Sequence, residues 1–278
     1  MTTLKIIINK NEIYIGNRLR HTIVQIKNIL EDVREFLERE SRKGKKLTRY
    51  KVKENPPKYF KESNIKIELD ECKEIILQEE TKLELGGVNT QSFSIIYPLT
   101  EINLVQNNKI TVLGPEIHEI NTPNIDFGMF VLLGVKKISE KLYNELLHFN
   151  FISNGIEGFM IRTIPRRFWC RLSNGLINKG VSFELLGNAI IHLYKQKFKD
   201  VIETMEIFIV NSHPDSISQF IELTEEIRDS QRTRWKEKIE KWKENIDCDY
   251  DWDCADCPYE ETCDEVKEVL EEREKMEE

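Results

Sequence analysis

Short apolar, β-rich segments alternate with helical patterns through the second half of the sequence. Residues 127–134 and 201–210 are rich in the β-branched and aromatic side chains that favour strands. The spacing of apolar residues predicts a helix over residues 182–197 and a long helix over residues 214–242. A chain that alternates in this way is expected to fold as an α/β or mixed α+β domain, with helices packed on a sheet.

The N-terminal region predicts a β-hairpin followed by an amphipathic helix. Residues 4–8 and 12–16 are rich in isoleucine and flank a turn-like segment, which is typical of two paired strands. After them, apolar residues recur at steps of three and four, and these are Leu19, Ile23, Ile26, Leu30, Val33 and Leu37. This stripe indicates a helix face that packs on the core or on another subunit.

A basic, proline-containing segment, residues 41–58, follows this helix in a chain with a formal net charge of −8. We interpret the segment as a solvated linker, with a contact for an acidic partner or a phosphorylated ligand as the alternative. The acidic balance of the whole chain argues against a nucleic-acid-binding protein. No apolar run approaches the roughly 20 residues of a membrane span, and no secretory signal is present, so we expect a cytoplasmic protein without membrane contact.

Four of the six cysteines lie in one short stretch with the spacing C-x5-C-x2-C-x5-C, and they are Cys248, Cys254, Cys257 and Cys263. In a reducing compartment, clustered thiols point to a metal rather than to disulfides. Four thiolates suit either a [4Fe-4S] cluster or a closed structural zinc site, and Pro258 directly after Cys257 favours the cluster. The sequence therefore predicts three regions. They are a hairpin, helix and basic linker over residues 1–60, an α/β domain over 61–245, and a metal lobe with an acidic helix over 246–278.

Five segments in the middle of the chain match, in order, segments of one known family. They read L-E-L-G-G at 83–87, K-I-T-V-L-G-P-E-I at 109–117, I-E-G at 156–158, F-W-C-R-L-S at 168–173 and L-G-N-A-I at 186–190. Their order and spacing resemble the β subunit of the CO dehydrogenase/acetyl-CoA synthase complex over about residues 83–230. The resemblance implies a core like that family's middle domain and a role in anaerobic one-carbon metabolism.

The chain departs from the family after this region. The family's cysteine-rich domain, which carries a nickel-iron-sulfur cluster, has no match here, so its nickel ligands cannot be assigned to any residue of this sequence. The resemblance then implies an iron-sulfur accessory, assembly or electron-transfer subunit beside corrinoid or nickel-iron-sulfur proteins. Two alternatives stay open: a subunit of an enzyme that transfers an acyl or methyl group on CoA, and a zinc-stapled protein-interaction module.

The resemblance also implies CoA binding at Trp169 and Arg171, which match a tryptophan and an arginine of the family. Arg166 and Arg167 do not match residue for residue, but they add the positive charge that CoA phosphates need. The alternative interpretation places Trp169 in the core and the arginines on a solvated edge. The two remaining cysteines, Cys72 and Cys170, are interpreted as ordinary buried thiols.

Overall fold

The computed structural model describes residues 10–87, 89–106, 108–147, 150–164, 167–229 and 233. The chain divides into two compact units, Met1–Leu223 and Thr224–Glu278. All the labelled helices and strands below belong to the first unit. Among the residues described, no helix has the length and the apolar character that crossing a membrane requires.

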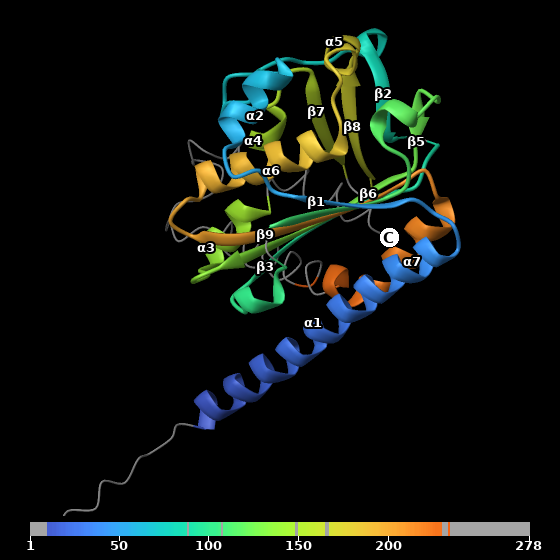
Figure 1. Cartoon of the computed structure of the whole chain (residues 1–278). Coiled ribbons are helices and arrows are strands. Elements are labelled where there is room, and N and C mark those ends of the chain that lie inside the picture. Colours follow the sequence, from blue (N-terminus) through green and yellow to red (C-terminus); the bar gives the residue numbers. More distant parts are fainter. Residues whose placement is uncertain are drawn as a thin grey trace, which may run out of the picture. The chain divides into compact units, whose positions relative to one another are not determined.

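A five-stranded sheet forms the centre of the first unit (Figure 1). In spatial order its strands are β1 (Leu47–Lys51), β4 (Lys109–Leu113), β9 (Ile202–Asn211), β6 (Phe127–Val135) and β3 (Ser92–Leu99). The β1–β4 and β6–β9 pairs are antiparallel, whereas β4–β9 and β3–β6 are parallel. Every residue of β6 is buried, as expected for a strand covered on both faces.

Helices cover both faces of this sheet. Helices α1 (Lys10–Arg42) and α7 (Pro214–Leu223) lie on one face (Figure 1), where the Phe220 ring stacks on Phe93 at a centroid distance of 4.9 Å. Helix α6 (Phe183–Lys197) lies on the other face and begins at Ser182, whose hydroxyl accepts a hydrogen bond from the Leu185 N–H (3.1 Å). The predicted helix over residues 182–197 is therefore confirmed.

A second, four-stranded sheet shares its core with α6 and the first sheet. Its strands, in spatial order, are β5 (Asn124–Ile125), β2 (Thr81–Gly86), β8 (Arg167–Ser173) and β7 (Phe159–Ile164). Four short helices complete the unit, and they are α2 (Pro56–Ser63), α3 (Glu140–Leu146), α4 (Asn150–Ser153) and α5 (Asn174–Asn178). Single 3-10 turns lie at Gln78–Glu80, Ile102–Leu104 and Ile117–Glu119. The arrangement confirms the predicted mixed α/β class.

The predicted N-terminal hairpin is wrong in its second strand, because residues 12–16 belong to helix α1. Residues 4–8, the other predicted strand, lie outside the described residues. An isolated two-stranded hairpin is marginal in water, whereas a helix satisfies its backbone hydrogen bonds internally and tolerates isoleucine at a small cost. The helical stripe is confirmed where side chains are described, since Ile26, Leu30, Val33 and Leu37 are buried.

The basic segment interpreted as a linker contains the edge strand β1, so that interpretation is wrong for residues 47–51. Tyr50 packs against the core and donates a hydrogen bond to the buried Glu116 carboxylate (2.6 Å), which fixes the strand. Several of the basic side chains pair within the chain. These ion pairs join Lys46 to Glu119, Arg49 to Glu38 and Lys53 to Glu184. Much of the positive charge of this segment is therefore neutralised internally.

Helix α7 begins at Pro214 as predicted and ends at Leu223, where the first unit also ends. After a turn at residue 224, residues 225–229 are again helical, so the predicted long helix is interrupted here rather than stopped. The predicted helix was to continue to residue 242. The sequence carries no glycine or proline near residue 223, so it gives no local signal for this interruption. Residues 230–232 and the part of the predicted helix beyond residue 233 lie outside the described residues.

Candidate ligand site on the four-stranded sheet

Strand β8 presents alternate side chains to the core and to the outer face of the four-stranded sheet. Phe168, Cys170 and Leu172 are buried in the core, whereas Trp169 and Arg171 lie on the outer face and are partly buried. Burial raises the pKa of the Cys170 thiol well above its ordinary value, so this thiol stays protonated. Cys170 and Cys72 are both free and buried, which confirms their interpretation as ordinary core thiols.

The Arg171 guanidinium bridges two neighbouring parts of the chain. Its Nε donates to Glu84 Oε1 on β2 (3.2 Å), and its Nη1 donates to the backbone oxygen of Ile76 (3.2 Å). Both side chains of the ion pair are about three-quarters buried, with 22% and 25% exposed. Arg171 therefore ties β8 to β2 and to the segment that precedes β2, which leaves fewer of its donors for a phosphate.

Trp169 lies at a close contact between strands. In the β2–β8 pair it is opposite Gly86, which has a φ of +82°, and a Cβ at this glycine would come within 2.4 Å of the Phe168 carbonyl oxygen. On its other side Trp169 is opposite Arg162 of β7, whose side chain is exposed. The indole Nε1 of Trp169 is buried and has no hydrogen-bond partner in the part of the chain that the structure describes. A buried donor without an acceptor costs roughly 1–3 kcal/mol.

The structure brings together only part of the predicted site. Trp169 and Arg171 share one face of one strand, but Arg166 and the side chain of Arg167 lie outside the described residues. All four predicted metal ligands, Cys248, Cys254, Cys257 and Cys263, also lie outside them. Within the described ranges, no group of three or more histidine, cysteine, aspartate or glutamate side chains is arranged to hold a metal ion.

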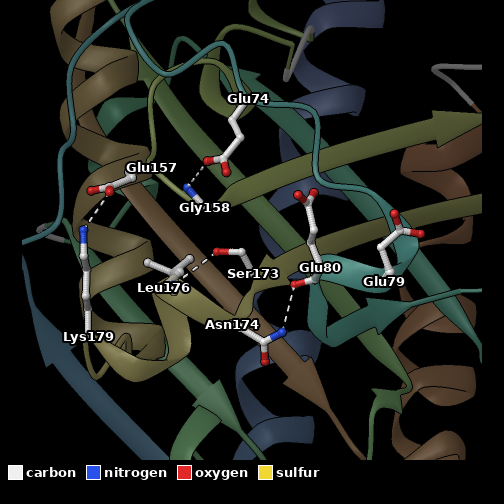
Figure 2. A pocket seen from close by; sticks show the side chains of 10 residues that line it. Glu74, Glu79, Glu80, Glu157, Gly158, Ser173, Asn174, Leu176 and Lys179 are labelled. Carbon is white, nitrogen blue, oxygen red and sulfur yellow. Dashed lines mark hydrogen bonds and ion pairs between the residues drawn. The ribbon is translucent and has the colours of Figure 1, made fainter.

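A pocket of about 410 Å³ opens where α5 meets the segment before β2 (Figure 2). Its lining includes four glutamates, Glu74, Glu79, Glu80 and Glu157, and one cation, Lys179. The remaining lining comes from the start of β7 and from the β8–α5 junction. The pocket is therefore an acidic hollow, unlike the cationic site that a CoA phosphate would need.

The carboxylates of the pocket differ in the number of hydrogen bonds and ion pairs that they form within the chain. Glu157 forms an ion pair with Lys179 (2.7 Å) and accepts a hydrogen bond from the Lys66 N–H (3.0 Å), and these contacts lower the pKa of Glu157. Among the described residues, Glu74 accepts one hydrogen bond, from the Gly158 N–H (3.2 Å, Figure 2), and Glu80 accepts one from the Leu77 N–H (2.9 Å).

Sequence reasoning missed this pocket. The run Gln78-Glu79-Glu80 was a local signal of negative charge. Glu157 and Lys179 lie about 80 and 100 residues further along the chain. They come close to this run only because the four-stranded sheet brings the two parts of the chain together.

Two sheets around one core, with a partly buried Trp169–Arg171 face and an acidic pocket beside α5, define a mixed α/β domain with two candidate binding surfaces. The family model described as CO dehydrogenase/acetyl-CoA synthase complex beta subunit matches residues 69–215, more than half of the 278 residues. The chain therefore belongs to this family, which confirms the resemblance seen in the sequence.

Individual relatives agree with the family model. The acetyl-CoA decarbonylase/synthase complex subunit beta of Methanopyrus kandleri is 28% identical over 143 residues, which are 50% of this chain and 30% of the relative. The protein of the same name from Methanothermobacter thermautotrophicus is 24% identical over 63% of this chain and 36% of its own length. The carbon monoxide dehydrogenase/acetyl-CoA synthase subunit alpha of Moorella thermoacetica is 24% identical over 55% of this chain and 21% of its own length. The chain thus spans well under two thirds of these curated relatives.

Proposed function

We propose that this chain is an accessory subunit of a CO dehydrogenase/acetyl-CoA synthase-type complex in one-carbon metabolism. One observation carries the proposal: the family match ends at residue 215, and the four-cysteine stretch follows it in a separate unit. The family domain would then supply the docking scaffold, and the cysteine stretch would carry a metal group of its own.

The proposed metal group is a [4Fe-4S] cluster held by Cys248, Cys254, Cys257 and Cys263, and it would serve electron transfer or assembly of the complex. Aspartates and glutamates surround these cysteines in the sequence. Their negative charge would disfavour reduction of a cluster that is already anionic. A structural zinc ion is the alternative occupant of four thiolates, and it would leave an interaction module without redox function.

The test is anaerobic purification of the full chain, followed by iron, sulfide and zinc analysis and a visible absorption spectrum. We expect about four iron and four sulfide per chain, lost in Cys254→Ser and in Cys257→Ser. Cys72→Ser is the matched control, because Cys72 lies in the family domain and should leave the metal content unchanged. Stoichiometric zinc with no visible absorption would contradict the electron-transfer role.

The proposed partners are the corrinoid or nickel-iron-sulfur subunits of such a complex. Affinity-tagged chain would be purified from its source cells without oxygen, and co-eluting proteins would be identified by mass spectrometry with cobalt and nickel analysis. Recovery of these subunits in fixed stoichiometry supports the proposal. Elution of the chain by itself, with its metal present, would contradict the accessory role while leaving the metal assignment intact.

A second candidate function is CoA binding. It is favoured by the indole N–H of Trp169, which has no acceptor among the described residues, and by the exposed Arg162 beside it. Isothermal titration with CoA and with dephospho-CoA tests it. If the site is used, Arg162→Gln weakens CoA binding by about tenfold, because a charge-assisted contact to phosphate is lost. Lys51→Gln, at an exposed lysine of β1 on the other sheet, is the control and should bind as the unchanged chain does.

A further inference from the structure

The segment before β2 holds two aliphatic side chains in solvent on a fixed backbone. Ile75 is 67% exposed and Leu77 is 50% exposed, the highest values for large apolar side chains among the described residues. Between them Ile76 is buried, and its carbonyl oxygen accepts the hydrogen bond from Arg171. The Cys72 N–H donates to the Asn154 carbonyl oxygen (2.7 Å), which fixes the start of the segment. Ile75 and Leu77 are therefore presented on an anchored strip.

The same segment supplies most of the negative charge of the pocket in Figure 2. Its only lining cation, Lys179, is paired with Glu157, so Glu74, Glu79 and Glu80 have no cation facing them among the lining residues. Glu74 and Glu80 each use one carboxylate oxygen on a backbone N–H. We call Ile75, Leu77 and these three glutamates the 74–80 surface.

The charge and the apolar side chains of the 74–80 surface indicate what kind of ligand it could bind. A bare metal ion needs converging carboxylates, and the described residues hold no such group. The pocket, at about 410 Å³, has room for a long organic cation. Ile75 and Leu77 would lose their exposed apolar surface to an occupant with apolar groups of its own, so the occupant should carry such groups beside its positive charge.

We propose that the 74–80 surface docks a basic segment of a partner protein, with a lysine or arginine side chain in the pocket and an aliphatic side chain on Ile75 and Leu77. Charge complementarity favours this occupant, since its cation would meet three glutamates that face no cation among the described lining residues. The inference goes beyond the proposed metal role and does not depend on the cysteine stretch.

The test uses the full chain and a fluorescein-labelled ten-residue peptide in which lysine and leucine alternate, with a glutamate–leucine peptide as the control ligand. Binding would be measured by fluorescence anisotropy. We expect the lysine peptide to bind and the glutamate peptide not to bind. The double variant Ile75→Ser/Leu77→Ser should weaken binding by about tenfold, and Glu79→Gln should weaken it by about threefold. All three side chains are exposed, so these changes should preserve the fold.

Matched controls separate the surface from the general negative charge of the chain. Ile138→Ser removes another exposed aliphatic side chain, and Glu203→Gln removes a carboxylate from β9, and both should bind as the unchanged chain does. Equal binding by all variants, or no binding by any, would overturn the proposal. A change of oligomeric state in the double variant, seen by light scattering, would identify a second copy of this chain as the occupant and would also overturn it.

Discussion

The guanidinium of Arg171 joins residues that are far apart in the sequence. It bonds to Glu84 and to the carbonyl oxygen of Ile76, and both partners precede it by more than 80 residues. The contact therefore stabilises the four-stranded sheet as well as the 74–80 surface. Any ligand that recruits Arg171 must compete with these two contacts.

Loss of the Arg171–Glu84 ion pair should lower the free energy of unfolding, and the effect of changing one residue should depend on whether the other is present. We expect Arg171→Ala to lower the free energy of unfolding by about 1–2 kcal/mol, since one partly buried ion pair and one hydrogen bond are lost. A double-mutant cycle with Glu84→Ala, measured by urea unfolding, should give a coupling energy of about 1 kcal/mol. Strictly additive effects would show that the pair contributes nothing to stability.

Single-residue features of the site were only partly predictable. The F-W-C-R-L-S motif was enough to select Trp169 and Arg171, and the distance of Cys170 from the four clustered cysteines was enough to assign it to the core. The bond from Arg171 to Glu84 was not, because strand register across 87 residues has no local signature. The same limit applies to the burial of the Trp169 N–H without an acceptor among the described residues, which depends on how closely β2 and β7 approach β8.

At the scale of elements, the buried carboxylate of Glu40 links the end of helix α1 to helix α7 by a hydrogen bond. Glu40 is fully buried and accepts hydrogen bonds from Lys43 (2.6 Å), from Lys45 and from the Ser216 hydroxyl (3.1 Å) of α7. Burial alone would raise the pKa of Glu40, but the hydrogen bonds from the two lysines and Ser216 outweigh it and lower the pKa to about 2.

This shift predicts an acid-dependent stability. The carboxylate keeps its charge in the folded state down to about pH 2, whereas in the unfolded chain it is protonated near its ordinary value of 4.5. The stabilisation is therefore fully present above pH 4.5 and is lost as the pH falls toward 2. Urea unfolding should show Glu40→Gln less stable by roughly 2 kcal/mol at pH 7, with the gap closing below pH 4.

The matched control for this prediction is Glu31→Gln, at an exposed carboxylate of the same helix that lies 3.7 Å from Lys27. It should differ from the unchanged chain by less than about 0.5 kcal/mol at every pH. A gap between Glu40→Gln and the unchanged chain that stays constant from pH 7 to pH 3 would contradict the depressed pKa.

The β2–β8 pair depends on a glycine that permits close approach. Gly86→Ala should lower the free energy of unfolding by about 2–4 kcal/mol, because a Cβ would clash with the Phe168 carbonyl oxygen and would also strain a positive φ. Gly180→Ala has a similar φ of +76° with open space around it, so it should cost only about 1 kcal/mol. Equal losses in thermal or urea unfolding would show that the close approach is relaxed in solution.

Elements with a strong local pattern were predicted well. The β-rich run at residues 127–134 became strand β6, and the helical spacing of apolar residues over 182–197 became α6. The isoleucines of residues 12–16 fitted a strand equally well by composition, and only the continuity of the helix decides between the two. Strand β1 was missed because it lies in a basic stretch of the sequence, and the acidic partner of its Arg49, Glu38, belongs to helix α1.

At the scale of the whole molecule, the chain consists of two compact units, and the family match belongs to the first. If the cysteine stretch holds a metal, its removal should affect the second unit alone. We expect calorimetry to show two unfolding transitions, one of which is lost in Cys254→Ser while the other shifts by less than about 2 °C. A single transition that moves as a whole would show that the units unfold together.

The position of β9 in the five-stranded sheet constrains how the protein is made. It is the last strand of the sheet in the sequence, yet it lies between β4 and β6 and pairs with both. During synthesis, the β1–β4 and β3–β6 pairs cannot join into one sheet until β9, which ends at residue 211, has left the ribosome. Pulse-labelled hydrogen exchange should therefore show the amides of β4 and β6 gaining protection in the same step as those of β9. Strand β9 fills the gap between β4 and β6. A nascent chain stalled before residue 202 would therefore leave the facing edges of β4 and β6 unpaired and open to chaperones.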